Sequence, residues 1–284
     1  MVDKEIQRIK TAVIVPTLNA GLTWEYWIRA LLATGINNRD VYVVDSGSTD
    51  NTIPLASKAG FNVRQIEQGT FNHGGTRQEA VTRLAGYDIA VFLTQDAVLH
   101  DAESINNIIS YFESDRVCAV CGRQLPGQNA GAIEAHARLF NYPDTSSTSS
   151  ISDAREKGLK AVFLSNSFAA YRVSALLETG GFPANVIFGE DMYVAARMLK
   201  AGYKIAYAAD ACVYHSHNYS LIQEMKRYFD MGVFHAREPW IRQQFGTAES
   251  EGLRFVVSEI KYLSRHALWR IPEGILRTIL KYAG

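Results

Sequence analysis

The segment after the apolar run VYVV carries the first side chain whose type and position suit chemistry. This segment, Asp45–Asp50, reads DSGSTD, and its Gly47 permits a tight turn and a close approach of a ligand. Asp45 ends the apolar run, where a carboxylate can accept an N–H from a pyrimidine base or bind a ribose. Helix capping is the alternative role, and we assign it to Asp50 because a predicted helix follows it.

A second acid, Asp96, follows the apolar run IAVFL after Thr94 and Gln95. A carboxylate there can bind Mg²⁺ or Mn²⁺ on a diphosphate, since these ions take one or two protein carboxylates and keep several waters. His215 and His217 are spaced i, i+2, so an extended chain puts both on one face, and either can complete the metal shell. A turn-forming aspartate and two surface histidines are the alternative interpretation.

Two further segments suggest an anion site and a general base. In FNHGGTRQE, the spacing Thr76-x-x-Glu79 predicts a capping box, which places Arg77 in the first turn of a helix, where anions bind. A solvated surface arginine remains the alternative. In FGED, an acidic pair follows a glycine at a predicted helix start. Asp191 is the candidate base for an acceptor hydroxyl and Glu190 the second candidate, although both acids also suit the helix dipole.

The elements that must position these residues alternate along the first half of the chain. This alternation predicts an α/β fold, doubly wound, with a mostly parallel twisted sheet and helices on both faces. Ligands bind such sheets outside the carboxyl ends of the strands, where Pro16–Asn19, Asp45–Ser48 and Gln95–Asp96 converge. The predicted strands are Ala12–Val15, Val41–Val44, Ile89–Leu93 and Val117–Val120, and the predicted helices are Thr23–Ala33, Thr52–Ala59 and Thr76–Leu84.

The second half is less regular. It predicts a strand over Ala161–Tyr171, a helix over Glu190–Lys200, and short strands over Tyr203–Ala208 and Ala211–His215. The polar tract Asp144–Asp153 predicts a mobile loop. From Leu221 onward the pattern is helical, and residues 252–284 hold six basic and two acidic residues among many apolar ones.

Composition narrows the possible functions. The 284 residues carry 29 basic and 29 acidic side chains, so no global positive field exists to bind nucleic acid. A G-x-G-x-x-G fingerprint is absent, which argues against an ordinary dinucleotide site. Three cysteines, an N-terminus without an apolar stretch, and no run of about 18 apolar residues together predict a cytoplasmic protein.

Taken in order, the motifs PTLN, VVDSGSTDNT, GGTR, LTQDA, FGED and AGYKIAY resemble those of the inverting glycosyltransferases of family 2, which have the GT-A fold. The resemblance covers about residues 11–220 and implies a catalytic domain over 1–220 with a helical extension over 221–284. More narrowly, FNHGGTR, LTQDA and MGVFHAREPW resemble bacterial rhamnosyltransferases that use dTDP-L-rhamnose in O-antigen (lipopolysaccharide) synthesis.

The resemblance also implies roles for individual residues. Asp96 would bind the metal on the donor diphosphate, His215 would be the later metal ligand with His217 in reserve, and Asp191 would be the base. The first acid of the usual D-x-D is Thr94 here, which leaves metal dependence open. Arg77 would contact the base or a phosphate of the nucleotide. The full set of residues implied in nucleotide binding is Pro16, Thr17, Asn19, Asp45, Ser48, Arg77 and Gln95.

The implied reaction is one in-line displacement with inversion, from dTDP-L-rhamnose to a saccharide acceptor linked to a polyprenyl diphosphate. The basic, apolar C-terminal region suits peripheral contact with the inner face of the plasma membrane. Helices that cover the core or form a dimer explain the same pattern, and the sequence leaves the oligomeric state open. A sugar-phosphate nucleotidyltransferase and a non-catalytic nucleotide-sugar-binding module are the alternative functions.

Overall fold

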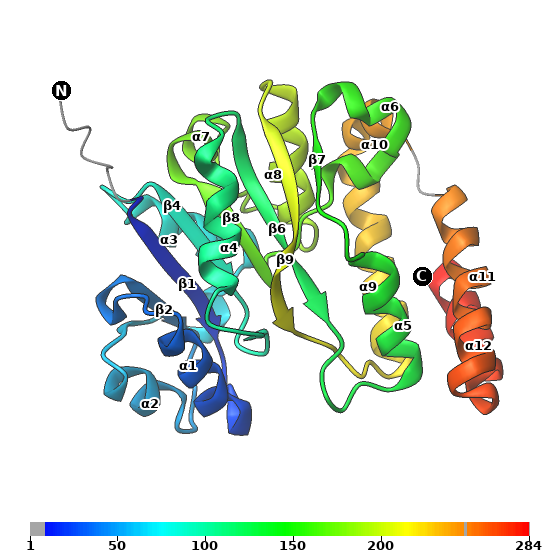
Figure 1. Cartoon of the computed structure of the whole chain (residues 1–284), viewed down its shortest axis with the longest axis horizontal. Helices are drawn as coiled ribbons and strands as arrows, with labels where there is room; N and C mark the ends of the chain where they lie inside the picture. The colour runs from blue at the N-terminus through cyan, green and yellow to red at the C-terminus, as the bar shows by residue number, and fades with distance from the viewer. Residues whose placement is uncertain (1–8, 247–248, 284) are drawn as a thin grey trace.

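Nine β-strands form one sheet in the computed structural model, which describes residues 9–246 and 249–283 (Figure 1). The strand order is β3-β2-β1-β4-β8-β6-β9-β5, and β7 pairs with β9. All strands run in one direction except β8 and the short β5 and β7. The bounds are β1 Thr11–Thr17, β2 Val41–Asp45, β3 Asn62–Gln65, β4 Ile89–Leu93, β5 Val98–Leu99, β6 Val117–Leu125, β7 Ser147–Ser149, β8 Phe168–Arg172 and β9 Lys204–Tyr214.

Helices cover both faces of the sheet, as the sequence predicts. Both faces of β1 are apolar, since Ile14 packs into one buried cluster and Val13 into the other. Helices α1 (Trp24–Ala33), α2 (Thr52–Lys58) and α4 (Ser104–Ser110) contribute to the cluster of Val13. Helices α3 (His73–Thr82), α7 (Val173–Glu178), α8 (Glu190–Lys200) and α10 (Pro239–Phe245) contribute to the cluster of Ile14.

The remaining helices lie beyond β9 (Figure 1). Helix α12 packs along α9, and α11 packs along α5, so the C-terminal helical region predicted from Leu221 onward is confirmed. Among the described residues, no helix is both long enough and apolar enough to cross a membrane. The bounds are α5 Ala132–Asn141, α6 Ala154–Lys157, α9 Leu221–Arg237, α11 Glu249–His266 and α12 Ile271–Ala283.

The carboxyl ends of β1, β2, β4, β6 and β9 meet at one edge of the sheet. In the β1–β2 register, Thr17 lies opposite Asp45, so the first two polar clusters are neighbours. The antiparallel strand β8 starts at this same edge, because Leu93 at the end of β4 pairs with Phe168 at the beginning of β8. The turn before β8 therefore joins the loops that follow the parallel strands.

Helix α3 begins earlier than predicted. Its N-cap is Asn72, whose side-chain oxygen accepts the Gly75 N–H at 2.7 Å. The capping box predicted at Thr76 is therefore wrong, and Arg77 lies one turn inside the helix. Gly74 is required by packing, since a Cβ there would lie 1.9 Å from the Pro183 carbonyl oxygen.

Three predictions for the second half are corrected by the structure. The strand predicted over Ala161–Tyr171 is wrong in its first part, where a 3₁₀ turn over Gly158–Val162 precedes β8. The two short strands predicted near residues 203–215 are one strand, β9. The tract predicted as a mobile loop contains β7, which pairs with β9, and a 3₁₀ turn closed by reciprocal hydrogen bonds of Ser150 and Asp153.

Candidate active site

Asp45 organises the loop at the end of β2. Its carboxylate is fully buried and accepts hydrogen bonds from the Thr17 hydroxyl at 2.7 Å and the Ser48 hydroxyl at 2.6 Å. The backbone N–H groups of Gly47 and Ser48 donate to its other oxygen. In this structure the Asp45 side chain faces the protein interior, where it fixes the loop after β2.

Gln95 and Asn19 fix the loop after β1. The Gln95 side chain accepts the Leu18 N–H at 2.8 Å and donates to the Leu18 carbonyl at 3.0 Å. Asn19 has a left-handed backbone with φ of 45°, and its side chain accepts the Thr49 N–H at 2.8 Å. The predicted residues Pro16, Thr17, Asn19, Asp45, Ser48 and Gln95 therefore lie at one edge, joined by these bonds and by the β1–β2 pairing.

Arg77 is buried and paired with Glu190. Its guanidinium lies 3.1 Å from a Glu190 carboxylate oxygen and donates to the His73 carbonyl at 2.9 Å. The Asn166 side chain donates to the same Glu190 oxygen at 3.1 Å. Because Arg77 is only 4% exposed, it neutralises Glu190 from behind the site and presents no free charge at the surface.

Asp191 is the acid of the pair that has no ion-pair partner among the described residues. Among the residues that the structure describes, its two oxygens accept only backbone N–H groups, from Met192 at 2.8 Å and from Asn166 at 3.3 Å. Burial and the neighbouring Glu190 charge raise the pKa of Asp191 to about 7. Two adjacent carboxyl groups in different environments recur in active sites. The environments separate their pKa values, so the two groups take different roles in proton transfer.

Gly189 places this acidic pair. It is the N-cap of α8 with φ of 79°, a left-handed conformation that favours glycine. A Cβ at this position would also lie 2.9 Å from the Phe234 ring of α9. Any other residue would displace the helix start that carries Glu190 and Asp191.

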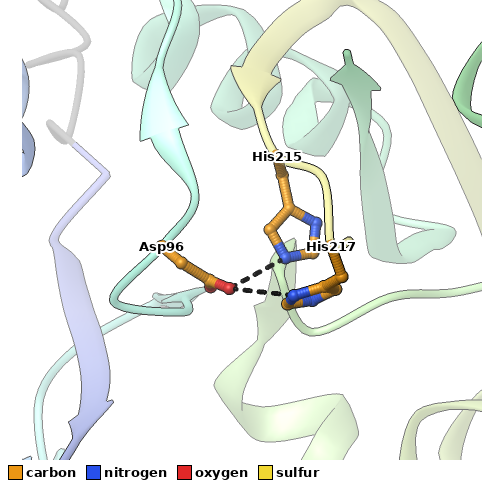
Figure 2. A group of neighbouring side chains, drawn as sticks. All are labelled: Asp96, His215 and His217. Atoms are coloured by element: carbon orange, nitrogen blue, oxygen red, sulfur yellow. Dashed lines mark ion pairs between the residues drawn. The ribbon is translucent and has the colours of Figure 1, made fainter. Parts of the chain in front are cut away.

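Asp96, His215 and His217 come together where β4 and β9 end, although the two histidines are far from Asp96 in sequence. One Asp96 carboxylate oxygen lies 3.4 Å from Nε2 of His215 and 3.5 Å from Nδ1 of His217 (Figure 2). One ligand atom from each residue lies within 4.8 Å of the others. A carboxylate and two imidazoles in this arrangement can hold a divalent ion.

The protonation of the group also fits a metal ion. The Gln124 amide nitrogen donates to the Ser165 hydroxyl at 2.9 Å, so its oxygen accepts from Nδ1 of His215 at 2.8 Å. This bond leaves the lone pair on Nε2, a buried atom without a hydrogen-bond partner among the described residues. Burial and His215 lower the pKa of His217 to about 4, so the His217 ring is available as a neutral ligand.

Two residues of the site have no counterpart among the sequence predictions. Asn166 binds Glu190 through its side chain and Asp191 through its backbone, and the Tyr171 hydroxyl in turn donates to it at 2.7 Å. Gln124 orients His215. Asn166 lies just before β8 and Gln124 lies near the end of β6, and no motif in the sequence identifies either.

Comparison with known proteins identifies the family. The sequence profile described as "Glycosyltransferase like family 2" matches residues 8–229. This chain belongs to glycosyltransferase family 2. It is therefore an enzyme that transfers a sugar, rather than a nucleotidyltransferase or a binding module.

Two curated relatives of this glycosyltransferase are close in sequence. The O-antigen chain rhamnosyltransferase RfbN of Salmonella typhimurium is 48% identical over 277 residues, which cover 97% of this chain and 88% of the relative. The O-antigen chain rhamnosyltransferase WbaN of Salmonella anatum is 48% identical over 273 residues, which cover 96% of this chain and 87% of the relative.

Solved structures share the fold of this glycosyltransferase at low sequence identity. The mannosyltransferase PcManGT from Pyrobaculum calidifontis, in complex with GDP-Man and Mn²⁺, has a TM-score of 0.61 and 18% identity over 97% of this chain and 75% of that one. TarS 1–349 from S. aureus, in complex with UDP-GlcNAc, has a TM-score of 0.57 and 19% identity over 94% and 79%. These likenesses confirm the predicted GT-A fold.

Proposed function

We propose that this glycosyltransferase transfers L-rhamnose from dTDP-L-rhamnose to a lipid-linked saccharide in O-antigen synthesis. The observation that carries the donor assignment is the near-complete match, at 48% identity, to two relatives named as O-antigen chain rhamnosyltransferases. The observation that carries the reaction type is the pairing of one neutralised and one available carboxyl group, Glu190 and Asp191, beside a cluster suited to a metal ion. We assign the chemistry to residues 1–220 and a supporting role to the helices of 221–284.

In the proposed reaction, Asp191 accepts the proton of the acceptor hydroxyl while the oxygen of that hydroxyl forms a bond to the anomeric carbon of the donor. The bond from that carbon to the diphosphate breaks, and its electron pair leaves with dTDP. Glu190, neutralised by Arg77, positions the base. The loops that Asp45 and Gln95 fix would hold the nucleoside of the donor. Because the acceptor oxygen attacks opposite the departing diphosphate, a single displacement inverts the anomeric configuration.

Asp96, His215 and His217 would hold a divalent ion. Two imidazole nitrogens favour Mn²⁺ over Mg²⁺, which takes oxygen ligands. When bound there, the ion would neutralise negative charge on the departing diphosphate. His217 would supply a second imidazole ligand beside His215.

A donor titration tests the rhamnosyl assignment. Binding of dTDP-L-rhamnose, UDP-glucose, UDP-GlcNAc and GDP-mannose is measured by calorimetry, each with and without Mn²⁺. We expect dTDP-L-rhamnose to bind most tightly and Mn²⁺ to strengthen its binding. Preference for a UDP or GDP sugar would contradict the donor assignment while leaving the fold and the site intact.

We also propose that α11 and α12 contact the membrane that carries the acceptor. Large apolar side chains are exposed on both helices and on the 3₁₀ turn between them, among them Leu253 of α11 at 67%, Trp269 of the turn at 79% and Ile279 of α12 at 59%. Basic residues such as Arg254 lie beside them, as in helices that rest at an anionic interface.

Flotation with vesicles that contain phosphatidylglycerol tests this contact. The variant that combines Leu253→Ser with Trp269→Ser is expected to lose flotation, because it removes exposed apolar surface without touching the core. The matched control is Leu177→Ser on α7, where the side chain is 41% exposed. Equal flotation of both variants, or no flotation of the native protein, would reject the membrane contact.

A further inference from the structure

A cavity opens beside the group of Asp96, His215 and His217, here called the metal cluster, on the side of the C-terminal helices. Its volume is about 400 Å³, which falls in the usual range of ligand pockets, roughly 300–1,000 Å³. Its walls come from the turn after β6, the segment between β9 and α9, and the first part of α12 with the turn before it. The lining includes Asn129, Asn218, Tyr219, Gln223, Arg270 and Arg277.

The walls are fixed by a buried charge network around Arg277. Its guanidinium, 9% exposed, donates to a Glu224 oxygen at 2.6 Å and to the Tyr219 carbonyl at 3.0 Å. It also contacts Glu273 at 2.9 Å, on its own helix. One residue therefore ties α12 to α9 and to the segment that carries the metal-binding histidines.

The cavity and the metal cluster share that segment. The ring of Tyr219, which lines the cavity, lies 4.9 Å from the ring of His217 between centroids. Ser216 lies between the two histidines, and its hydroxyl accepts the Gly127 N–H at 3.3 Å, which holds the opposite wall in place. A ligand in the cavity would thus lie next to the position proposed for the donor diphosphate.

The chemistry of the lining indicates a neutral, hydroxyl-rich ligand. Arg277 is neutralised by Glu224 and Glu273, and Arg270 contacts Glu273 at 2.9 Å, so the cavity offers little free positive charge for a phosphate. The side chains of Asn129 and Asn218 make no hydrogen bond with any other residue in the described part of the chain. Amides can both donate to and accept from sugar hydroxyls.

We propose that this cavity binds the saccharide of the acceptor, with Asn129 and Asn218 as hydrogen-bonding partners of its hydroxyl groups. This inference rests on the proposed function, since only a glycosyltransferase needs an acceptor sugar beside its donor. It adds a place for the acceptor between the turn after β6 and helix α12.

The test uses the full chain, dTDP-L-rhamnose and a panel of lipid-diphosphate-linked galactose, glucose, mannose and rhamnose. Asn129→Ala and Asn218→Ala are each expected to raise the KM for the accepted sugar by about 5-fold, the loss of one hydrogen bond. The kcat and the KM for the donor should stay within about 2-fold of the native values. Gln128→Ala is the matched control, because Gln128 is exposed in the same turn and lies outside the lining.

Asn129→Trp gives a second, independent readout because it fills the cavity. Binding of the free methyl glycosides of the same four sugars is followed by saturation-transfer NMR, which needs no turnover. We expect binding to the native protein and to Gln128→Ala, and its loss in Asn129→Trp with donor binding retained. Unchanged acceptor KM values, or glycoside binding that survives Asn129→Trp, would overturn the assignment of the cavity. Absence of dTDP-L-rhamnose binding by the native protein would instead reject the proposed function.

Discussion

Asp191→Asn is expected to lower kcat by about 10²–10⁴-fold, the usual contribution of a general base, while dTDP-L-rhamnose binding persists. The amide has nearly the shape of the carboxylate but keeps only one acceptor oxygen, so one of the two backbone N–H groups, of Met192 or Asn166, loses its partner. Retained donor binding separates this local change from loss of the base. Turnover is measured by release of dTDP in the presence of acceptor, and donor binding by calorimetry. Asp115→Asn, at an exposed position in the turn before β6, is the matched control. Near-native turnover of Asp191→Asn would remove Asp191 from the mechanism.

The pH dependence follows from the same carboxyl group. A base works only when it is deprotonated, and burial together with the Glu190 charge raises the pKa of Asp191 to about 7. The value of kcat/KM should therefore rise with pH up to about 7, level off above it, and fall as pH drops below it. A profile that stays flat from pH 5 to pH 8 would contradict this assignment.

Glu190 is distinguished from Asp191 by its contacts. One of its oxygens already binds Arg77 and the Asn166 side chain, so its negative charge is compensated. Breaking a buried pair by removing one partner leaves an uncompensated charge, which is strongly destabilising. Glu190→Gln is therefore expected to destabilise the fold as well as to lower activity, so Asp191→Asn is the more direct test of the base.

Asp96→Ala is expected to abolish the strengthening of donor binding by Mn²⁺ and to lower turnover by about 100-fold or more. Asp96 supplies the carboxylate that faces both His215 and His217, so its removal leaves two imidazoles without a charged ligand. Calorimetry with dTDP-L-rhamnose, with and without Mn²⁺, measures the first effect, and Asp115→Ala is the control. An Asp96→Ala protein that still responds to Mn²⁺ would show that the ion binds elsewhere.

Much of this site could be predicted because strand ends converge. Asp45 and Asp96 each follow an apolar run, and parallel strands bring such positions to one edge of the sheet. This placement does not depend on how the helices pack. His215 joined them because β9 runs in the same direction as β4 and ends at the same edge. These placements need only the direction and length of strands, which hydrophobic runs reveal.

Other features depend on tertiary contacts that local patterns do not encode. Asn166 enters the site because β8 runs antiparallel to its neighbours and starts at the active edge, an arrangement invisible in a short sequence window. The observed start of α3 differs from the predicted one because Asn72 and Thr76 are both good N-cap residues, and local preference cannot choose between them. Packing of Gly74 against the Pro183 carbonyl is compatible with the earlier start.

The linkage configuration of the transfer product tests the central claim most directly. The protein, dTDP-β-L-rhamnose, Mn²⁺ and the lipid-diphosphate sugar panel are incubated together, and the product is characterised by NMR. A single displacement with Asp191 as base predicts an α-L-rhamnoside, formed with one equivalent of dTDP. A β-L-rhamnoside would contradict the one-step mechanism.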